Sequence, residues 1–172
     1  FTLLAKSNPL IARQTRKALQ RADALLSDCE RDQRLAHRDW GLAAEKVSVV
    51  LPSSGGVQRS LFYPDRVPEL RARLHIPESA PVVINPRGFR GYVRQEVFFR
   101  ATPLVLKDYP DAVFVCTGMQ SNPIAERWTS ELRITNNVRL LPSAPHNAMA
   151  DLFRVSDITV SPSEHDGTPN SL

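Results

Sequence analysis

The sequence has few cysteines and lacks a long apolar run, and these absences argue against several classes of protein. It has two cysteines, Cys29 and Cys116, which lie far apart and form no Cys-x-x-Cys pair, so neither a zinc site nor a disulfide framework is indicated. No apolar run is long enough to span a membrane, and no initiating Met or charged signal segment stands at Phe1, although a start lost upstream stays open. A reducing compartment fits this composition best, and we expect a cytoplasmic protein.

Lysine is scarce as well, with 4 Lys against 18 Arg and a net charge of +4. The planar guanidinium group of arginine binds phosphate with two hydrogen bonds, so this bias is compatible with phosphate-bearing ligands or nucleic acid. A solvated basic surface is the plainer explanation. With 42% hydrophobic and 23% charged residues, the 172-residue chain is expected to fold as one domain, or as a small domain with part of another.

Short apolar segments recur in the second half of the chain, and each ends in Pro, Gly or Ser. They occupy residues 81–86, 111–118, 137–143 and 157–163 and are typical of buried strands. Apolar residues at helical spacing lie between them, and Pro103 is expected to interrupt or kink the first of these helices. This alternation predicts an α/β fold, a Rossmann-like doubly wound parallel sheet with right-handed crossovers.

The first half also alternates, but it is more highly charged. Residues 8–23 and 30–42 are predicted helices, and residues 24–29 and 46–52 are predicted strands. A stretch rich in Gly, Arg and Pro follows. We interpret residues 1–64 as the end of one α/β domain with the start of a linker, 65–80 as linker, and 81–172 as a second domain. The first domain is expected to be incomplete, because its elements cannot cover both faces of a parallel sheet.

An arginine-rich loop follows the first strand of the second domain. Ligands of open α/β sheets bind beyond the carboxyl ends of the strands. Arg87, Arg90 and Arg94 alternate there with Gly88 and Gly91, and this combination of positive charge and accessible backbone suits a diphosphate. The alternative is a surface loop whose arginines are only solvated.

The last residues form a second candidate site. Thr168 and Pro169 are typical of the first positions of a helix, whose free N–H groups bind anions. A carboxylate repels phosphate, so Asp166 is expected to face sugar hydroxyl groups or the reacting centre. Glu164 is either a ligand contact or simply exposed.

The loop after the third strand of the second domain has little charge. Pro142, Ser143 and Ala144 lie in it and could form a wall beside a nucleobase, although a plain connection explains the loop equally well. No acidic cluster suited to a metal is visible in the sequence.

The order of "INPRGFRG", "VFVCTG" and "NVRLLPSAPHNAMADLFRVSDITVSPSEHDGTPNSL" resembles the retaining nucleotide-sugar glycosyltransferases of GT-B architecture, the group-one (family 4) type. Gly56, Val57, Phe62 and Pro64 also resemble that family's passage from the N-terminal domain to the linker. The resemblance implies two Rossmann-like domains that face each other across a cleft, with the donor held mainly by the C-terminal one. It further implies that this chain is a fragment, inactive alone, with the donor domain truncated at its C-terminal end.

The resemblance also assigns roles to residues. It places Arg87 on the donor diphosphate, and it places Arg94 near a position where the family has lysine. The arginine-rich loop adds Arg90 as a third candidate for the diphosphate. Asp166 takes the first of two acidic positions and approaches the donor sugar, while the second position falls two residues after Leu172. Further donor contacts are expected from Glu164, Gly167, Thr168, Pro169 and Asn170, with Pro142, Ser143 and Ala144 beside the base. Neither cofactor nor metal is expected.

The expected substrates are therefore a UDP or GDP sugar and a saccharide or lipid-linked acceptor, as in the synthesis of cell-envelope polysaccharide. Basic residues of the first helix suggest a peripheral contact at the inner face of a membrane, with a solvated helix face as the alternative: Arg13, Arg16, Lys17 and Arg21.

Two other functions stay open. A different nucleotide-binding α/β enzyme is disfavoured, because no G-x-G-x-x-G fingerprint follows a predicted strand. A basic nucleic-acid-binding module would bind DNA or RNA with a steep dependence on salt, but nucleic acid is not the partner we expect.

Overall fold

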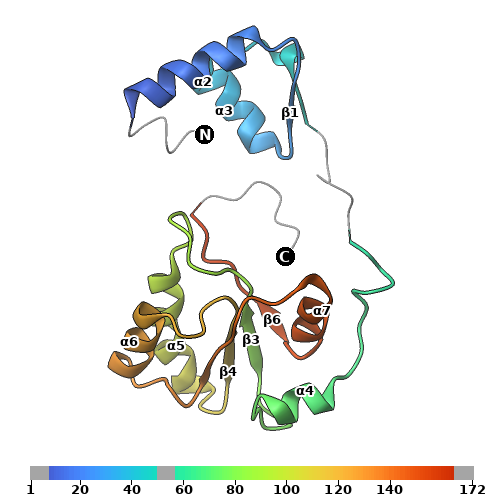
Figure 1. Ribbon diagram of the computed structural model, residues 1–172, viewed down its shortest axis with the longest axis vertical. Helices are drawn as coiled ribbons and strands as arrows, with labels where there is room; N and C mark the ends of the chain where they lie inside the picture. The colour runs from blue at the N-terminus through green and yellow to red at the C-terminus, as the bar shows by residue number, and fades with distance from the viewer. Residues whose placement is uncertain (1–7, 50–56, 165–172) are drawn as a thin grey trace. The chain divides into compact units, whose positions relative to one another are not determined.

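The computed structural model describes residues 8–49 and 57–164, and the chain divides between residues 56 and 57 into two compact units (Figure 1). Each unit contains a parallel sheet of its own. Among the described residues, no helix is both long and apolar enough to cross a membrane.

The first unit repeats a helix and a strand, as predicted. Its elements are α2 (Pro9–Arg21), β1 (Leu25–Ser27), α3 (Glu30–Trp40), a short 3-10 turn (Ala44–Lys46) and β2 (Val47–Val49). The two strands pair in parallel, with Leu25 opposite Val47. The Asn8 side chain accepts hydrogen bonds from the first free N–H groups of α2, and it therefore acts as the N-cap of that helix.

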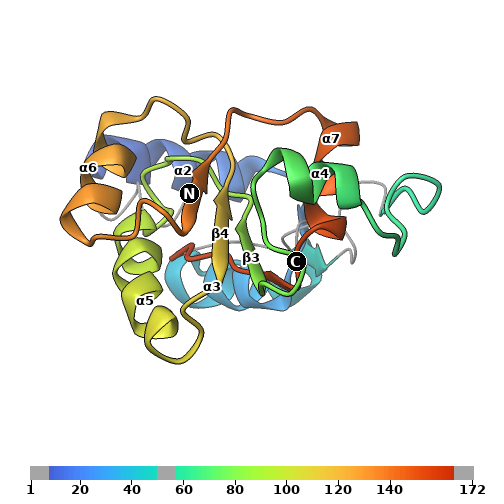
Figure 2. The ribbon, with the colours of Figure 1, turned by 90° about the horizontal axis from the view of Figure 1, so that it is seen from below.

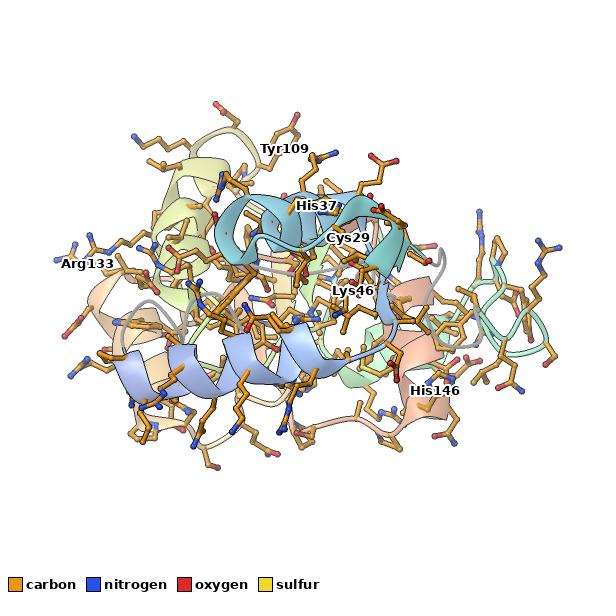
Figure 3. All side chains as sticks on the ribbon, turned by 90° about the horizontal axis from the view of Figure 1, so that it is seen from above. Cys29, His37, Lys46, Tyr109, Arg133 and His146 are labelled. Carbon is orange, nitrogen blue, oxygen red and sulfur yellow. The ribbon has the colours of Figure 1, made fainter. Side chains whose placement is uncertain are left out.

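Side-chain to main-chain hydrogen bonds join the elements of this unit. Lys46 Nζ donates to the carbonyl of Gln20 at 2.8 Å, and His37 Nδ1 donates to the carbonyl of Leu42 at 2.5 Å. Figure 3 labels both side chains, together with Cys29 at the start of α3. These bonds tie the ends of α2 and α3 to the segment that leads into β2.

The second unit is the predicted doubly wound α/β sheet. Its elements are α4 (Pro68–Arg73), β3 (Val82–Asn85), α5 (Gln95–Asp108), β4 (Val113–Cys116), α6 (Pro123–Glu131), β5 (Val138–Leu140), α7 (His146–Arg154) and β6 (Ile158–Thr159). The strands are all parallel, in the order β5-β4-β3-β6. Figure 2 shows α5 and α6 on one side of β3 and β4, and α4 and α7 on the other.

Alternate residues of the central strands supply two separate cores. Val83 pairs with Phe114, and both pack with Phe99 of α5 in the core under α5 and α6. Ile84 pairs with Val115, and both belong to the core under α4 and α7. Because both faces are covered, these strands are apolar except for Asn85 at the end of β3, which is close to the pattern that the sequence showed.

The expected linker, residues 65–80, belongs to the second unit in the structure. Leu70 of α4 and Ile76 are buried in the core under α4 and α7. Arg139 of β5 donates to the carbonyls of Leu74 at 2.7 Å and His75 at 2.8 Å. These contacts fasten the segment to the sheet, and composition alone did not reveal them.

The preceding residues 57–64 also pack within the second unit. The Phe62 ring lies 4.9 Å from that of His146 and 6.1 Å from that of Phe153, both on α7. Arg154 Nε donates to the carbonyl of Tyr63 at 3.0 Å. These contacts anchor residues 57–64 to α7, whereas the sequence predicted that Phe62 and Pro64 lie where the first domain passes into the linker.

Of the two effects expected of Pro103, an interruption or a kink, the interruption does not occur, because α5 continues through this residue. Proline removes one backbone donor, but Phe98, Phe99 and Thr102 are all buried in the turns before it. Their packing holds the helix together across the missing hydrogen bond, which is how tertiary contacts overcome a weak local preference.

We expect Phe99→Ala to lower the free energy of unfolding of the second unit by about 3–5 kcal/mol, because it leaves a cavity in a core where Phe99 is 0% exposed. The control is Val97→Ala on the same helix, where the side chain is 49% exposed and the cost should stay within about 0.5 kcal/mol. Chemical denaturation followed by circular dichroism measures both. Equal losses in the two variants would contradict the placement of α5.

Candidate functional site

Loops from all four strands of the second unit meet at one edge of its sheet, because parallel strands place their carboxyl ends together. The loops are residues 86–94 after β3, 117–122 after β4, 141–145 after β5 and 160–164 after β6. This edge contains every expected donor residue that the structure describes.

Two glycines let the first loops approach each other closely. Gly118 has a φ of +68°, and a Cβ built on it would lie 3.5 Å from Gly88 Cα and 3.3 Å from Ser143 Oγ. The loops after β3, β4 and β5 therefore touch at one point. Ser143, one of the three residues expected beside the base, lies at this junction.

Tyr92 links two arginines of the first loop. The Arg87 guanidinium carbon lies 6.0 Å from the centre of the Tyr92 ring, and Arg90 Nη1 donates to the Tyr92 hydroxyl at 3.2 Å. Phe89, between them in sequence, stacks on Trp128 of α6 with ring centres 5.8 Å apart. Phe89 therefore packs this loop against α6, while Arg90 and Arg94 are exposed.

The end of this loop pairs with the segment after β6. Val93 forms an antiparallel bridge with Ser163. The Arg94 N–H donates to the carbonyl of Pro162 at 3.1 Å, and the Glu164 N–H donates to the carbonyl of Tyr92 at 2.9 Å. Residues that are distant in sequence are thereby brought to the same place.

The Arg94 side chain already has two carboxylate partners. Its Nε lies 2.5 Å from Glu96 Oε1, and its Nη1 lies 3.5 Å from Glu164 Oε1. The hydrogen bond from Arg94 lowers the pKa of Glu96 below its ordinary value. The structure thus places Arg94 and Glu164 together, as an ion pair at the site edge.

A pair of buried side-chain amides, Asn85 and Gln95, lies under the loop, and neither was predicted from the sequence. Asn85, at the end of β3, donates from Nδ2 to Gln95 Oε1 at 2.7 Å and accepts the Arg87 N–H at 3.1 Å. Gln95 Nε2 donates to the carbonyls of Arg87 and Gly88. The available signal was the polar residue that ends an otherwise apolar strand.

The remaining residues that were expected at the site differ in burial, and some lie outside the described part of the chain. Pro142 is exposed, and Ala144 is half-buried against the core under α4 and α7. Asp166, the main candidate in the last stretch, lies outside the described residues. So do Gly167, Thr168, Pro169 and Asn170.

Two further features involve other residues of the chain. A cavity of about 250 Å³ is bordered by Phe62, Tyr63 and Phe153 beside α7, and it includes no residue of the arginine loop. In the described part of the chain, the ligand atoms of Asp28, Cys29 and Asp32 lie within 4.8 Å of one another. We assign no metal to this group, since acidic residues at a helix start also stabilise the helix dipole.

Comparison with known protein families identifies the family of this chain. The family model described as "Glycosyl transferases group 1" matches residues 66–172, more than half of the chain. The chain belongs to the group 1 glycosyltransferases. The matched region starts just before α4 and includes the whole arginine loop.

Relatives agree with this family. A D-inositol 3-phosphate glycosyltransferase of Streptosporangium roseum is 29% identical over 87% of this chain and 36% of its own length. One of Catenulispora acidiphila is 30% identical over 83% of this chain and 36% of its own length. The chain thus spans about a third of the length of these curated relatives.

Solved structures show the same fold. Sucrose-phosphate synthase of Thermosynechococcus elongatus superposes with a TM-score of 0.72 at 21% identity, covering 90% of this chain and 38% of that one. HepE of Anabaena, in complex with UDP and glucose, superposes with a TM-score of 0.69 at 18% identity, covering 87% of this chain and 40% of that one.

The contact between the loops of this group 1 glycosyltransferase chain depends on Gly118. We expect Gly118→Ala to destabilise the second unit by about 1–2 kcal/mol, because the positive φ is unfavourable for a residue with a Cβ. Gly91→Ala is the matched control, since no atom lies within 4 Å of its added Cβ. Denaturant unfolding measures both, and an equal stability of the two variants would contradict the loop packing.

The Arg94 contact should be visible in a titration. Because the folded-state pKa of Glu96 is below its ordinary 4.5, the contact stabilises the protein above that pH and is lost as the pH falls through the lowered pKa. We expect Arg94→Met to raise the pKa of Glu96, measured by carbon-detected NMR of the carboxyl group. Arg127→Met, which removes an equal charge beside Glu131, should leave the pKa of Glu96 unchanged.

Proposed function

We propose that this chain provides the donor-binding part of a glycosyltransferase that moves a sugar from a nucleotide-diphosphate donor to an acceptor, with retention of configuration. Family membership supports the reaction class. The observation that carries the proposal is the convergence of an arginine loop with Gly88, Gly118 and Ser143 at the carboxyl edge of the sheet. Main chain and positive charge are both accessible there, as a diphosphate requires.

Arg87 has the leading role at the diphosphate. Its guanidinium group is held over Tyr92, so it is oriented before the donor arrives. As the bond from the sugar to the diphosphate breaks, negative charge grows on the leaving oxygen, and a preorganised cation lowers the barrier by stabilising that charge. Arg90, hydrogen-bonded to the same tyrosine, adds to the positive potential.

Arg94 differs from Arg87 because its charge is already neutralised by ion pairs with Glu96 and Glu164. It can bind a diphosphate only by exchanging a carboxylate partner for a phosphate oxygen. Displaced Glu164 would then be available for a sugar hydroxyl group, in agreement with the contact expected for it. Asp166 is proposed to approach the same sugar.

UDP is the first donor nucleotide to test, because the fold matches a HepE structure that contains UDP and glucose. The acceptor is proposed to be a saccharide or lipid-linked molecule, and the relatives' name adds inositol phosphate to the candidates. We propose that the whole protein acts in the cytoplasm with a peripheral membrane contact, and that it needs neither cofactor nor metal.

Titration calorimetry of the chain with UDP and GDP tests the donor site. We expect Arg87→Ala to weaken binding by about 10- to 100-fold, the effect of removing a charge-assisted hydrogen bond. Arg127→Ala, which removes the same charge from the exposed face of α6, should bind like the wild type. Absence of binding in folded wild-type protein, or equal binding by the two variants, would refute the assignment.

A further inference from the structure

We propose that Gln95 is a positioning residue for the donor diphosphate: its buried amide, acting with Asn85, holds the main chain that carries Arg87. The inference rests on the proposed function for its link to the donor. It does not make Gln95 a ligand, since the side chain is 1% exposed and cannot reach a donor at the surface.

The hydrogen bonds of Asn85 and Gln95 determine which atom of each side-chain amide is the oxygen and which is the nitrogen. A main-chain N–H can only donate, so the Asn85 atom that faces the Arg87 N–H at 3.1 Å is the oxygen Oδ1. Asn85 Nδ2 then faces Gln95 at 2.7 Å, and the Gln95 atom there is Oε1. Gln95 Nε2 is left to donate to the carbonyls of Arg87 and Gly88, the latter at 3.1 Å.

These hydrogen bonds hold the main chain at residues 87 and 88 through both its N–H and its carbonyl groups. The N–H of Arg87 is held by Asn85, and the carbonyls of Arg87 and Gly88 are held by Gln95. The orientation of these peptide groups fixes where the Arg87 side chain leaves the loop. It also sets the place of Gly88, whose Cα lies against Gly118.

Burial gives the pair its rigidity. Asn85 is 0% exposed, and water cannot replace a hydrogen bond lost at such a site, so an unpaired amide or carbonyl would be costly. Cys116, which lies opposite Asn85 on β4, is also 0% exposed. What the two amides contribute at this buried position is hydrogen bonds to the main chain of the loop.

The test is Gln95→Met, which keeps the size of the side chain and removes its hydrogen bonds. We expect amide hydrogen exchange at Arg87, followed by NMR in the free chain, to become faster by about tenfold or more, and UDP binding to weaken by about tenfold. The control is Thr102→Val, which removes a buried hydroxyl from α5 that bonds only within the helix, to the Phe98 carbonyl. It should cost stability without changing either readout.

Asn85→Asp provides a second, independent variant. An aspartate still accepts the Arg87 N–H but cannot donate to Gln95, whose amide must turn and present its oxygen to the two carbonyls. We expect the same faster exchange and weaker UDP binding as in Gln95→Met.

Each outcome decides the proposal. Slow exchange at Arg87 in folded Gln95→Met, unchanged UDP affinity in that variant, or an equal loss of affinity in Thr102→Val would overturn it. If the wild type binds neither UDP nor GDP, the proposed function fails, and faster exchange at Arg87 in Gln95→Met would still establish that the amide holds the loop.

Discussion

The central strand β3 is hydrogen-bonded in parallel to β4 on one side and to β6 on the other, while helices cover both faces of the sheet. All four residues of this strand are buried, so each must be apolar or fully hydrogen-bonded. Parallel pairing also requires helical crossovers, and these return every strand in the same direction. The shared edge at which the loops meet follows from this single constraint.

At that edge the chain passes from a buried strand to a loop. Within a few residues, its main-chain and side-chain polar groups need hydrogen-bond partners outside the sheet. Asn85 and Gln95 meet this requirement from below, and Tyr92 and Glu164 meet it at the surface. The arginines are therefore held in place by neighbours of several kinds. In the proposed donor site, this arrangement would orient positive charge before the donor binds, which is the condition for effective electrostatic stabilisation.

Much of the fold was predictable from the sequence, because each buried strand is a short apolar run and each helix repeats apolar residues at its own period. The departures have physical reasons. Residues 65–80 look like a linker by composition, yet Leu70 and Ile76 are core residues, and Arg139 bonds to carbonyls of that segment from β5. Pro103 suggested a break in α5, but the burial of the preceding turn outweighed the lost donor.

The sequence by itself determined the alternation of strands and helices, the parallel sheet, and the place of the arginine loop after a buried strand. These depend on local periodicity and on the chemistry of single residues. Only the tertiary structure decided the partners of those residues: Glu164 beside Arg94, Gly88 against Gly118, and the amides under Arg87. Such contacts join segments that are far apart in the chain or buried beneath it, and no local pattern encodes which groups will meet when the sheet closes.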